Sequence, residues 1–318
     1  MSAAAPPLLV VLTGPTGTGK SACALALVEH LSAQRPVEIV SVDSAQVYRG
    51  MDIGTAKPEA AIRERVPHHL IDIRDPAQSY SAGDFVREAR SAVAAIHARG
   101  ALPLLVGGTM LYLRALREGL AGLPEASPEV RRQIDALAAE RGWAAVHAEL
   151  SDVDPAAAAR IAPQDAQRLQ RALEVYRLTG VPISRWQQRT QPPQAQYRWM
   201  RYALWPSARE QLRQRLQSRF EAMLAAGLVD EVRALYARGD LTPRHASMRA
   251  VGYRQLWLHC AGELKLAQAS AMAVAATAQL AKRQLTWLRR EREMTLLGDT
   301  SVGIVETLAE QISAASRA

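Results

Sequence analysis

The chain is poor in cysteine and in phenylalanine. Among its 318 residues there are two Cys and two Phe, and aromatic residues make up only 5%. Two cysteines far apart in the sequence, Cys23 and Cys260, exclude a small disulfide-rich scaffold. They are typical of a protein in a reducing compartment, so we expect a cytoplasmic protein.

The sequence also lacks long hydrophobic runs. Its apolar stretches are all shorter than the roughly 18 uncharged residues that a membrane-spanning helix requires. The first residues, MSAAAPP, lack the basic flank and the long apolar segment of a secretory signal. We therefore expect no association with a membrane.

Positive charge is present in excess but is unevenly distributed. The net charge is +8, and residues 195–293 hold 17 Lys and Arg against 8 Asp and Glu, a balance of +9. The remaining sequence has a balance of −1, so the whole excess lies in the C-terminal third. This pattern favours a polyanionic partner such as RNA or DNA, and the alternative is a solvated helix face.

Buried strands alternate with helices over the first part of the chain. Short apolar runs at 8–13, 37–42 and 102–106 predict strands, with a short edge strand at 69–73. Helical spacing predicts helices at 21–31 and 81–99. This alternation indicates an α/β fold with a parallel sheet flanked by helices, of the kind found in P-loop NTPases.

The pattern changes to helices alone after Glu118. We expect helices from Ser127 to Glu140, at 154–161 and at 164–179. The sequence therefore predicts a helical insertion domain at 118–194, within a core domain of residues 1–117 and 195–318. In the returning core segment we expect a strand at 197–205, followed by helices at 207–226, 228–238, 251–259 and 265–290.

A glycine-rich segment near the N-terminus matches the phosphate-binding pattern G-x-x-x-x-G-K-[ST]. It lies between a predicted strand and a predicted helix, which is the context that this motif requires. Its glycines allow backbone N–H groups to surround an anion, Lys20 adds a positive charge, and Ser21 offers a hydroxyl to Mg²⁺. A nucleotide such as ATP and a simple diphosphate present similar oxygens, so the loop alone does not select between them. The residues predicted to bind phosphate are Gly14, Pro15, Thr16, Gly17, Thr18, Gly19, Lys20 and Ser21.

Polar residues follow two other predicted strands. Asp43, Ser44 and Gln46 come after the strand at 37–42, and Thr109 follows the strand at 102–106. Ligands of open α/β sheets bind beyond the carboxyl ends of the strands, so we expect these residues beside the phosphate loop. Asp43 has the chemistry of a metal ligand or a catalytic base, and the alternative is a loop acid or helix cap. The Gln46 amide is suited to reading an adenine edge.

Several further blocks occur in a fixed order along the chain. They are GPTGTGKS, DSAQVYRGMDIGTAKP, PHHLIDI, GGTMLY, RAVGYRQ and LAKRQLTWLR. From about Leu8 to about Arg290 the sequence resembles the tRNA dimethylallyltransferase family, which prenylates adenosine 37 beside the anticodon. Some eukaryotic members of this family carry a C-terminal zinc finger. This sequence contains no Cys-x₂-Cys pair and therefore resembles the bacterial type.

The resemblance implies transfer of a dimethylallyl group from dimethylallyl diphosphate to N6 of adenosine 37, in tRNAs that read codons beginning with U. The bound phosphates would then belong to the leaving diphosphate, with Mg²⁺ held at Ser21. By the same resemblance Asp43 is the base, and an arginine binds the diphosphate. Arg219 matches that arginine best, and Arg215 lies one turn away as the alternative. The implied catalytic residues are Asp43, Thr109, Lys20 and Arg219.

The resemblance also implies contacts with the tRNA anticodon stem-loop. Read directly, the basic residues of RAVGYR and KRQLTWLRR are suited to phosphates, and Trp287 and Tyr253 to stacking on bases. Core packing is the alternative for both aromatic residues. The residues implied to contact tRNA are Asp43, Ser44, Ala45, Gln46, Thr109, Arg131, Gln164, Asp165, Ala166, Gln167, Arg168, Arg249, Ala250, Val251, Gly252, Tyr253, Arg254, Lys282, Arg283, Gln284, Leu285, Thr286, Trp287, Leu288 and Arg289.

Two other functions share some of these features. A small-molecule kinase would use the same phosphate loop, but it does not require a basic C-terminal third. A non-catalytic RNA-binding protein that senses nucleotide would not require Asp43 beside the loop. His68 and His69 are adjacent on a predicted strand and would point to opposite sides, so they make a poor metal site. Without a heptad pattern, we expect a monomer.

Overall fold

The structure is a computed structural model that describes residues 6–188, 196–291, 293–298 and 303–317. The chain divides into two compact units, one formed by Met1–Arg114 with Ala195–Ala318 and the other by Ala115–Gln194. Within the described residues, helices that are long and apolar enough to cross a membrane are absent.

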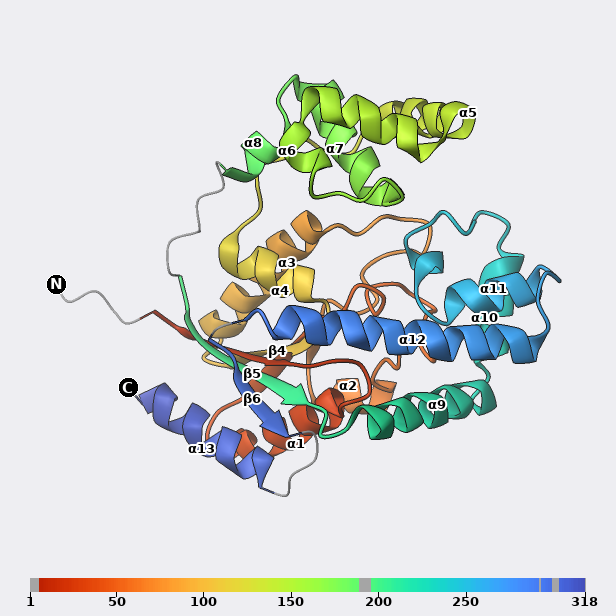
Figure 1. The fold of residues 1–318 in the computed structure, drawn as a ribbon. Coiled ribbons are helices and arrows are strands. Elements are labelled where there is room, and N and C mark those ends of the chain that lie inside the picture. Colours follow the sequence, from red (N-terminus) through yellow and green to blue (C-terminus); the bar gives the residue numbers. More distant parts are fainter. Residues whose placement is uncertain (1–5, 189–195, 292, 299–302, 318) are drawn as a thin grey trace. The chain divides into compact units, whose positions relative to one another are not determined.

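The larger unit is built on a parallel sheet with the strand order β3-β2-β4-β1-β5-β6 (Figure 1). All neighbouring strands pair in parallel. Every residue of β1 and β2 is buried, as expected for strands covered on both faces. The strands are β1 (Leu8–Thr13), β2 (Val37–Val42), β3 (His68–His69), β4 (Leu102–Gly107), β5 (Arg198–Trp205) and β6 (Thr295–Gly298).

Helices cover both faces of this sheet. On one face, Leu27 of α1 and Ile312 of α13 join the core around Leu12 of β1. On the other face, α3 packs on β2 and β4 and begins at a capping box formed by Ser81 and Asp84. The helices of this unit are α1 (Lys20–Ser32), α2 (Ala60–Arg65), α3 (Ala82–Ala98), α4 (Met110–Glu118), which crosses the unit boundary, α9 (Arg209–Ala225), α10 (Leu228–Ala237), α11 (Tyr253–Cys260), α12 (Leu266–Leu288) and α13 (Ile304–Arg317), with a 3₁₀ turn at Ser247–Arg249.

Helices α9, α10 and α11 lie toward the carboxyl end of the sheet, where the arrow of β5 points, and α12 extends from the sheet to them (Figure 1). Helix α12 packs against α9 and α11, and α10 packs against both α9 and α11. Side chains from this group therefore reach the edge of the sheet at which ligands bind in open α/β folds.

The smaller unit is entirely helical over its described residues. It has its own core, in which Ile134, Val146 and Leu150 of α5 pack with Leu169 and Leu173 of α7. Its helices are α5 (Pro128–Val153), α6 (Pro155–Ala158), α7 (Ala166–Thr179) and α8 (Ile183–Gln188).

The predicted α/β class with a parallel sheet is confirmed, although several elements differ from the prediction. The edge strand predicted at 69–73 is wrong in extent, because only His68 and His69 pair with β2. The helix predicted to end at Glu140 continues to Val153 after a break at Gly142, where φ is +79°. Helices α2, α4, α8 and α13 and strand β6 were not predicted.

Candidate active site

Three neighbouring strands carry the predicted site at their carboxyl ends. The phosphate loop follows β1, Asp43 follows β2, and Thr109 follows β4, which lies between the other two strands. Backbone pairing places Val42 opposite Gly107 at the ends of β2 and β4. Residues about 30 and 90 positions beyond the loop in sequence therefore converge on it.

The phosphate loop has the glycines that its shape requires. Gly14, Gly17 and Gly19 adopt φ values of +146°, +84° and +81°. A Cβ atom on Gly17 would lie only 2.7 Å from Leu216 Cδ2 on α9. Glycine at this position therefore lets α9 approach the loop closely, and this approach brings Arg219, one turn after Leu216, to the same site.

Two cations lie beside this loop. Lys20 Nζ donates a hydrogen bond to the Pro15 carbonyl oxygen at 2.7 Å. Burial and the positive charge of Arg219 lower the pKa of Lys20 to about 8, although the negative charge of Asp43 opposes this shift. Burial also lowers the pKa of Arg219, again against the effect of Asp43. An anion bound at this point would relieve the repulsion between the two cations.

The carboxylate of Asp43 is fixed by its own turn. Its Oδ1 atom accepts hydrogen bonds from the backbone N–H groups of Ala45 (2.8 Å) and Gln46 (3.2 Å). The Ser44 N–H donates to Thr109 Oγ1 at 3.2 Å, which ties the end of β2 to the end of β4. Asp43 thus has a local structural role and also faces the same cavity as the phosphate loop.

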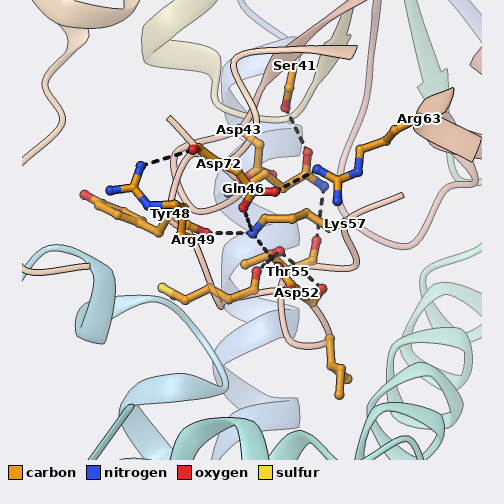
Figure 2. A network of polar contacts seen from close by, with 12 residues as sticks. Ser41, Asp43, Gln46, Tyr48, Arg49, Asp52, Thr55, Lys57, Arg63 and Asp72 are labelled. Carbon is orange, nitrogen blue, oxygen red and sulfur yellow. Dashed lines mark hydrogen bonds and ion pairs between the residues drawn. The ribbon is translucent and has the colours of Figure 1, made fainter. Parts of the chain in front are cut away.

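The amide of Gln46 is already engaged within the protein. Its Oε1 atom accepts from Ser41 Oγ at 2.8 Å, and its Nε2 donates to the carbonyl oxygens of Thr55 and Ala56 at 3.2 and 3.3 Å (Figure 2). In this conformation the amide group therefore braces the turn around Asp43, and reading an adenine edge would require these hydrogen bonds to be exchanged.

Gln284 of α12 links two of the strand-end loops. It is buried, accepts a hydrogen bond from the Thr16 N–H at 2.9 Å and donates to the Gly108 carbonyl oxygen at 2.8 Å. A Cβ atom on Gly108 would lie 2.4 Å from Gln284 Nε2, so this contact requires glycine. The sequence interpretation placed Gln284 against RNA, and no local pattern indicated this fastening role.

These loops surround one cavity of about 810 Å³. It brings together most of the predicted catalytic and phosphate-binding residues from β1, β2, β4 and α9. Arg219 faces this cavity, whereas Arg215 is not among its lining residues. The predicted site residues that line it are Thr16, Gly17, Gly19, Lys20, Ser21, Asp43, Ser44, Ala45, Gln46, Thr109, Arg219, Arg249, Ala250, Val251, Gly252, Tyr253, Arg283, Gln284 and Trp287.

The two C-terminal blocks present both exposed and buried side chains. Arg249, Arg254, Lys282, Arg283 and Arg289 are exposed, as contacts with RNA phosphates require.

The aromatic residues of these blocks are packed within the protein. Tyr253 is fully buried, and Trp287 packs beside Met110 and Leu288 with the Arg114 guanidinium 5.8 Å from its ring centre. Core packing, the alternative weighed from the sequence, thus describes Tyr253. The side chains of Leu285 and Leu288 are buried as well, so the basic residues remain the candidates for direct RNA contact.

The candidates in the helical unit have different local roles. Arg131 forms a two-point ion pair with the buried Glu174, with distances of 2.9 and 3.2 Å. Burial opposes ionisation of Glu174, but hydrogen bonds from Arg131 and Arg171 hold its pKa below the usual value. Asp165 caps α7 by accepting from the Arg168 N–H, while Gln164, Gln167 and Arg168 are exposed.

The Ser21 hydroxyl is an oxygen ligand of the kind that Mg²⁺ accepts. Ser21 lines the cavity at the first turn of α1, and the described residues contain no group of three or more His, Cys, Asp or Glu placed as metal ligands. Mg²⁺ commonly takes one or two protein oxygens and completes its shell with phosphates and waters. The Nε2 atom of His69 contacts Glu38 Oε2 at 2.6 Å, so it is engaged in this contact and not directed at a metal ion.

Fold and cavity together define an α/β enzyme with a phosphate loop, a nearby carboxylate and a cationic wall. Comparison with known proteins identifies the family within this class of enzyme. The sequence matches the family model described as IPP transferase over residues 46–291. The chain therefore belongs to the IPP transferase family, as the sequence resemblance predicted.

Named relatives agree with this assignment. A tRNA dimethylallyltransferase from Bordetella pertussis is 54% identical over 315 residues, which cover 96% of this chain and 99% of that protein. One from Thioalkalivibrio sulfidiphilus is 56% identical and covers 89% of this chain and 87% of its own. These relatives favour the prenyltransferase prediction over the small-molecule kinase.

Solved structures show the same fold. The full-length tRNA isopentenylpyrophosphate transferase from Bacillus halodurans superimposes with a TM-score of 0.70 at 36% identity, covering 98% of this chain and 97% of that one. A eukaryotic dimethylallyltransferase acting on tRNA gives a TM-score of 0.78 at 26% identity, covering 97% of this chain and 78% of that one.

Proposed function

We propose that the protein transfers the dimethylallyl group of dimethylallyl diphosphate to N6 of adenosine 37, in tRNAs that read codons beginning with U. The products are N6-(dimethylallyl)adenosine and diphosphate. The observation that carries this proposal is that Asp43, Thr109, Lys20 and Arg219 line one cavity with the phosphate loop.

The diphosphate end of the donor is assigned to the loop between β1 and α1. When the allylic C–O bond breaks, positive charge develops on carbon and negative charge on the diphosphate oxygens. In this proposal the loop N–H groups, the first turn of α1, Lys20 and Arg219 stabilise that negative charge. The ground state gains less from these groups, so they lower the barrier for departure of the diphosphate.

Ser21 is the protein group proposed to hold Mg²⁺. When bound, the ion would neutralise part of the charge on the leaving diphosphate. Ser21 is the second residue of α1, directly after Lys20, so its hydroxyl and the Lys20 ammonium would face the same phosphates.

Asp43 is assigned as the base that accepts the proton from the adenine N6. Its Oδ1 is held by two backbone N–H groups, which fixes the orientation of the carboxylate. As N6 bonds to the allylic carbon, its proton passes to Asp43 and the C–O electron pair leaves with the diphosphate. Thr109 is tied to the same turn through Ser44, and we assign it a contact with the adenosine.

The RNA is assigned to the exposed basic residues of the C-terminal third and to the helical unit. Adenosine 37 must be splayed out of the anticodon loop to reach the cavity. Lys282 and Arg283 on α12, with Arg249 and Arg254 around the start of α11, are exposed and supply charge for its phosphates. We also expect the enzyme to act as a monomer in the cytoplasm.

A direct assay tests the reaction. The protein is incubated with Mg²⁺, dimethylallyl diphosphate and unmodified tRNA that carries A36-A37-A38, and the digested nucleosides are analysed by mass spectrometry. We expect isopentenyladenosine at position 37 only. Phosphate transfer from ATP without prenylated adenosine would reject the proposal in favour of a kinase.

The role of Asp43 is best tested with Asp43→Asn. The substitution preserves an oxygen for the N–H groups of Ala45 and Gln46 but removes the base, so we expect turnover to fall at least about 100-fold. Binding of tRNA, measured by filter binding, should change less than about threefold. If tRNA affinity falls as much as turnover does, Asp43 serves chiefly in binding.

A further inference from the structure

Glu231 of α10 makes four hydrogen bonds. Three of them are to the loop at 52–54, which follows the turn around Asp43, and the fourth is to Tyr253, which packs against this loop. Its Oε2 accepts from the backbone N–H groups of Asp52 (2.8 Å) and Ile53 (2.7 Å). Its Oε1 accepts from the Gly54 N–H (3.2 Å) and from the Tyr253 hydroxyl (2.5 Å). Three successive N–H groups thus converge on one carboxylate, a nest that favours a negative charge.

The same loop is held from a second direction by Lys57. This side chain is only 2% exposed, and its ammonium contacts Asp52 Oδ1 at 2.5 Å, Asp72 Oδ1 at 2.5 Å and the Tyr48 carbonyl oxygen at 2.6 Å (Figure 2). A buried cation with three oxygen partners is rigidly placed. The loop is therefore fixed between Lys57 and Glu231.

Packing adds a steric constraint to this polar one. A Cβ atom on Gly54 would lie 2.5 Å from the ring of Tyr253, and Tyr253 is fully buried. The hydroxyl of Tyr253 keeps its proton, because burial and the negative charge of Glu231 raise its pKa. Ring and carboxylate together fix the position of Gly54.

From this loop, hydrogen bonds lead back to Asp43. The next two residues, Thr55 and Ala56, offer their carbonyl oxygens to Gln46 Nε2. The backbone N–H of Gln46 in turn donates to Asp43 Oδ1. A displacement of the loop at 52–54 would thus be transmitted to Asp43 through the side chain of Gln46.

We propose that Glu231 is a positioning residue that holds Asp43 in its reactive orientation, acting through the loop at 52–56 and Gln46. This inference rests on the proposed function, because it presupposes that Asp43 is the base. Glu231 is not among the residues that line the cavity, so its effect should fall on turnover and not on binding of the donor.

The test is Glu231→Gln in the full-length protein. The new NH₂ group replaces an acceptor with a donor that faces other donors, so the loop loses part of its anchor. We expect kcat for prenylation of tRNA to fall on the order of 10- to 100-fold, with KM for dimethylallyl diphosphate changed less than about twofold. Tyr253→Phe, which removes one of the four donors, should lower kcat about three- to tenfold.

A double substitution separates positioning from a general loss of structure. In the Asp43→Asn background Glu231→Gln should cause no further loss, since the base it positions is already absent. Asp230→Asn is the matched control, because Asp230 is the exposed neighbour on the same helix and forms an ion pair with Arg233 on that helix. It should leave kcat unchanged.

The outcomes distinguish this inference from the proposed function. If the unaltered protein forms no prenylated adenosine, the proposed function itself fails. If it does, the inference is overturned when Glu231→Gln retains the original kcat, or when it slows the Asp43→Asn protein as much as the unaltered one. Should Glu231→Gln unfold, as circular dichroism would show, Tyr253→Phe decides by the same two criteria.

Discussion

At the scale of single residues, we expect the protonation state of Lys20 to control how tightly dimethylallyl diphosphate binds. Its pKa of about 8 in the free protein reflects burial and the neighbouring Arg219. A bound diphosphate favours the charged ammonium and raises that pKa, so binding takes up a proton above about pH 8. We predict that Kd for dimethylallyl diphosphate is constant below about pH 7.5 and rises toward tenfold per pH unit above about pH 8.5, as measured by calorimetry.

The control for this prediction is Lys20→Arg. An arginine stays charged throughout this pH range, so its Kd, although weaker because the geometry differs, should be nearly independent of pH. A curve for the unaltered protein that is as flat as that of Lys20→Arg would contradict the assigned role of Lys20.

Single residues also mark where sequence reasoning stops. The place of Asp43 at a strand end beside the loop followed from the pattern of apolar runs, because parallel strands end at a common edge. The internal engagement of Gln46 did not, since its partners belong to a turn at Thr55 and Ala56 in which Ala56 adopts a φ of +50°. The hydrogen bonds from the backbone of residues 52–54 to Glu231 were equally hidden, because these residues lie about 180 positions away in the sequence.

At the scale of elements, α12 connects two loops through Gln284: the phosphate loop and the loop that follows β4. We predict that Gln284→Ala leaves the Thr16 N–H and the Gly108 carbonyl oxygen without their partner and lowers the free energy of unfolding by about 1–3 kcal/mol, as measured by urea denaturation. Because the phosphate loop loses a support, KM for dimethylallyl diphosphate should also rise.

The exposed Gln279 on the same helix provides the matched variant. Gln279→Ala should change the free energy of unfolding by less than about 0.5 kcal/mol. Equal effects of the two substitutions would show that α12 tolerates the loss of either amide and does not brace the loop through Gln284.

The helices and strands differ in how clearly the sequence predicts them. Strands β1, β2 and β4 are uninterrupted apolar runs, and their bounds were predicted within a residue. Strand β6 has four mostly exposed residues and owes its conformation to pairing with β5, which no local pattern reveals. Helix α13 did carry a signal, with Leu308 and Ile312 one turn apart and buried, but its apolar stripe is short.

At the scale of the whole molecule, the uneven charge predicts how the enzyme holds RNA. Each phosphate neutralised by a cation releases counterions, so log Kd for tRNA should rise steeply with log salt concentration. Replacing both Lys282 and Arg283 with Ala should weaken binding and reduce that slope by about 1.4, if each residue neutralises one phosphate. Filter binding across a series of KCl concentrations measures both effects.

Lys265 at the opposite end of α12 supplies the comparison, because it is also exposed. Lys265→Ala removes one positive charge but should leave the slope within about 0.3 of the original. A slope that depends only on net charge, and not on which residue is changed, would argue against a defined RNA path along the C-terminal part of α12.

The strand order has a consequence for synthesis on the ribosome. Strand β1 is made first and lies inside the sheet, yet one of its two partners, β5, begins only at Arg198, after the helical unit has been translated. Until then the apolar segment LLVVLT has one unpaired backbone edge, which is the kind of surface that other chains pair with. We therefore expect a nascent chain that stalls before β5 is complete to be more prone to aggregation than the finished chain.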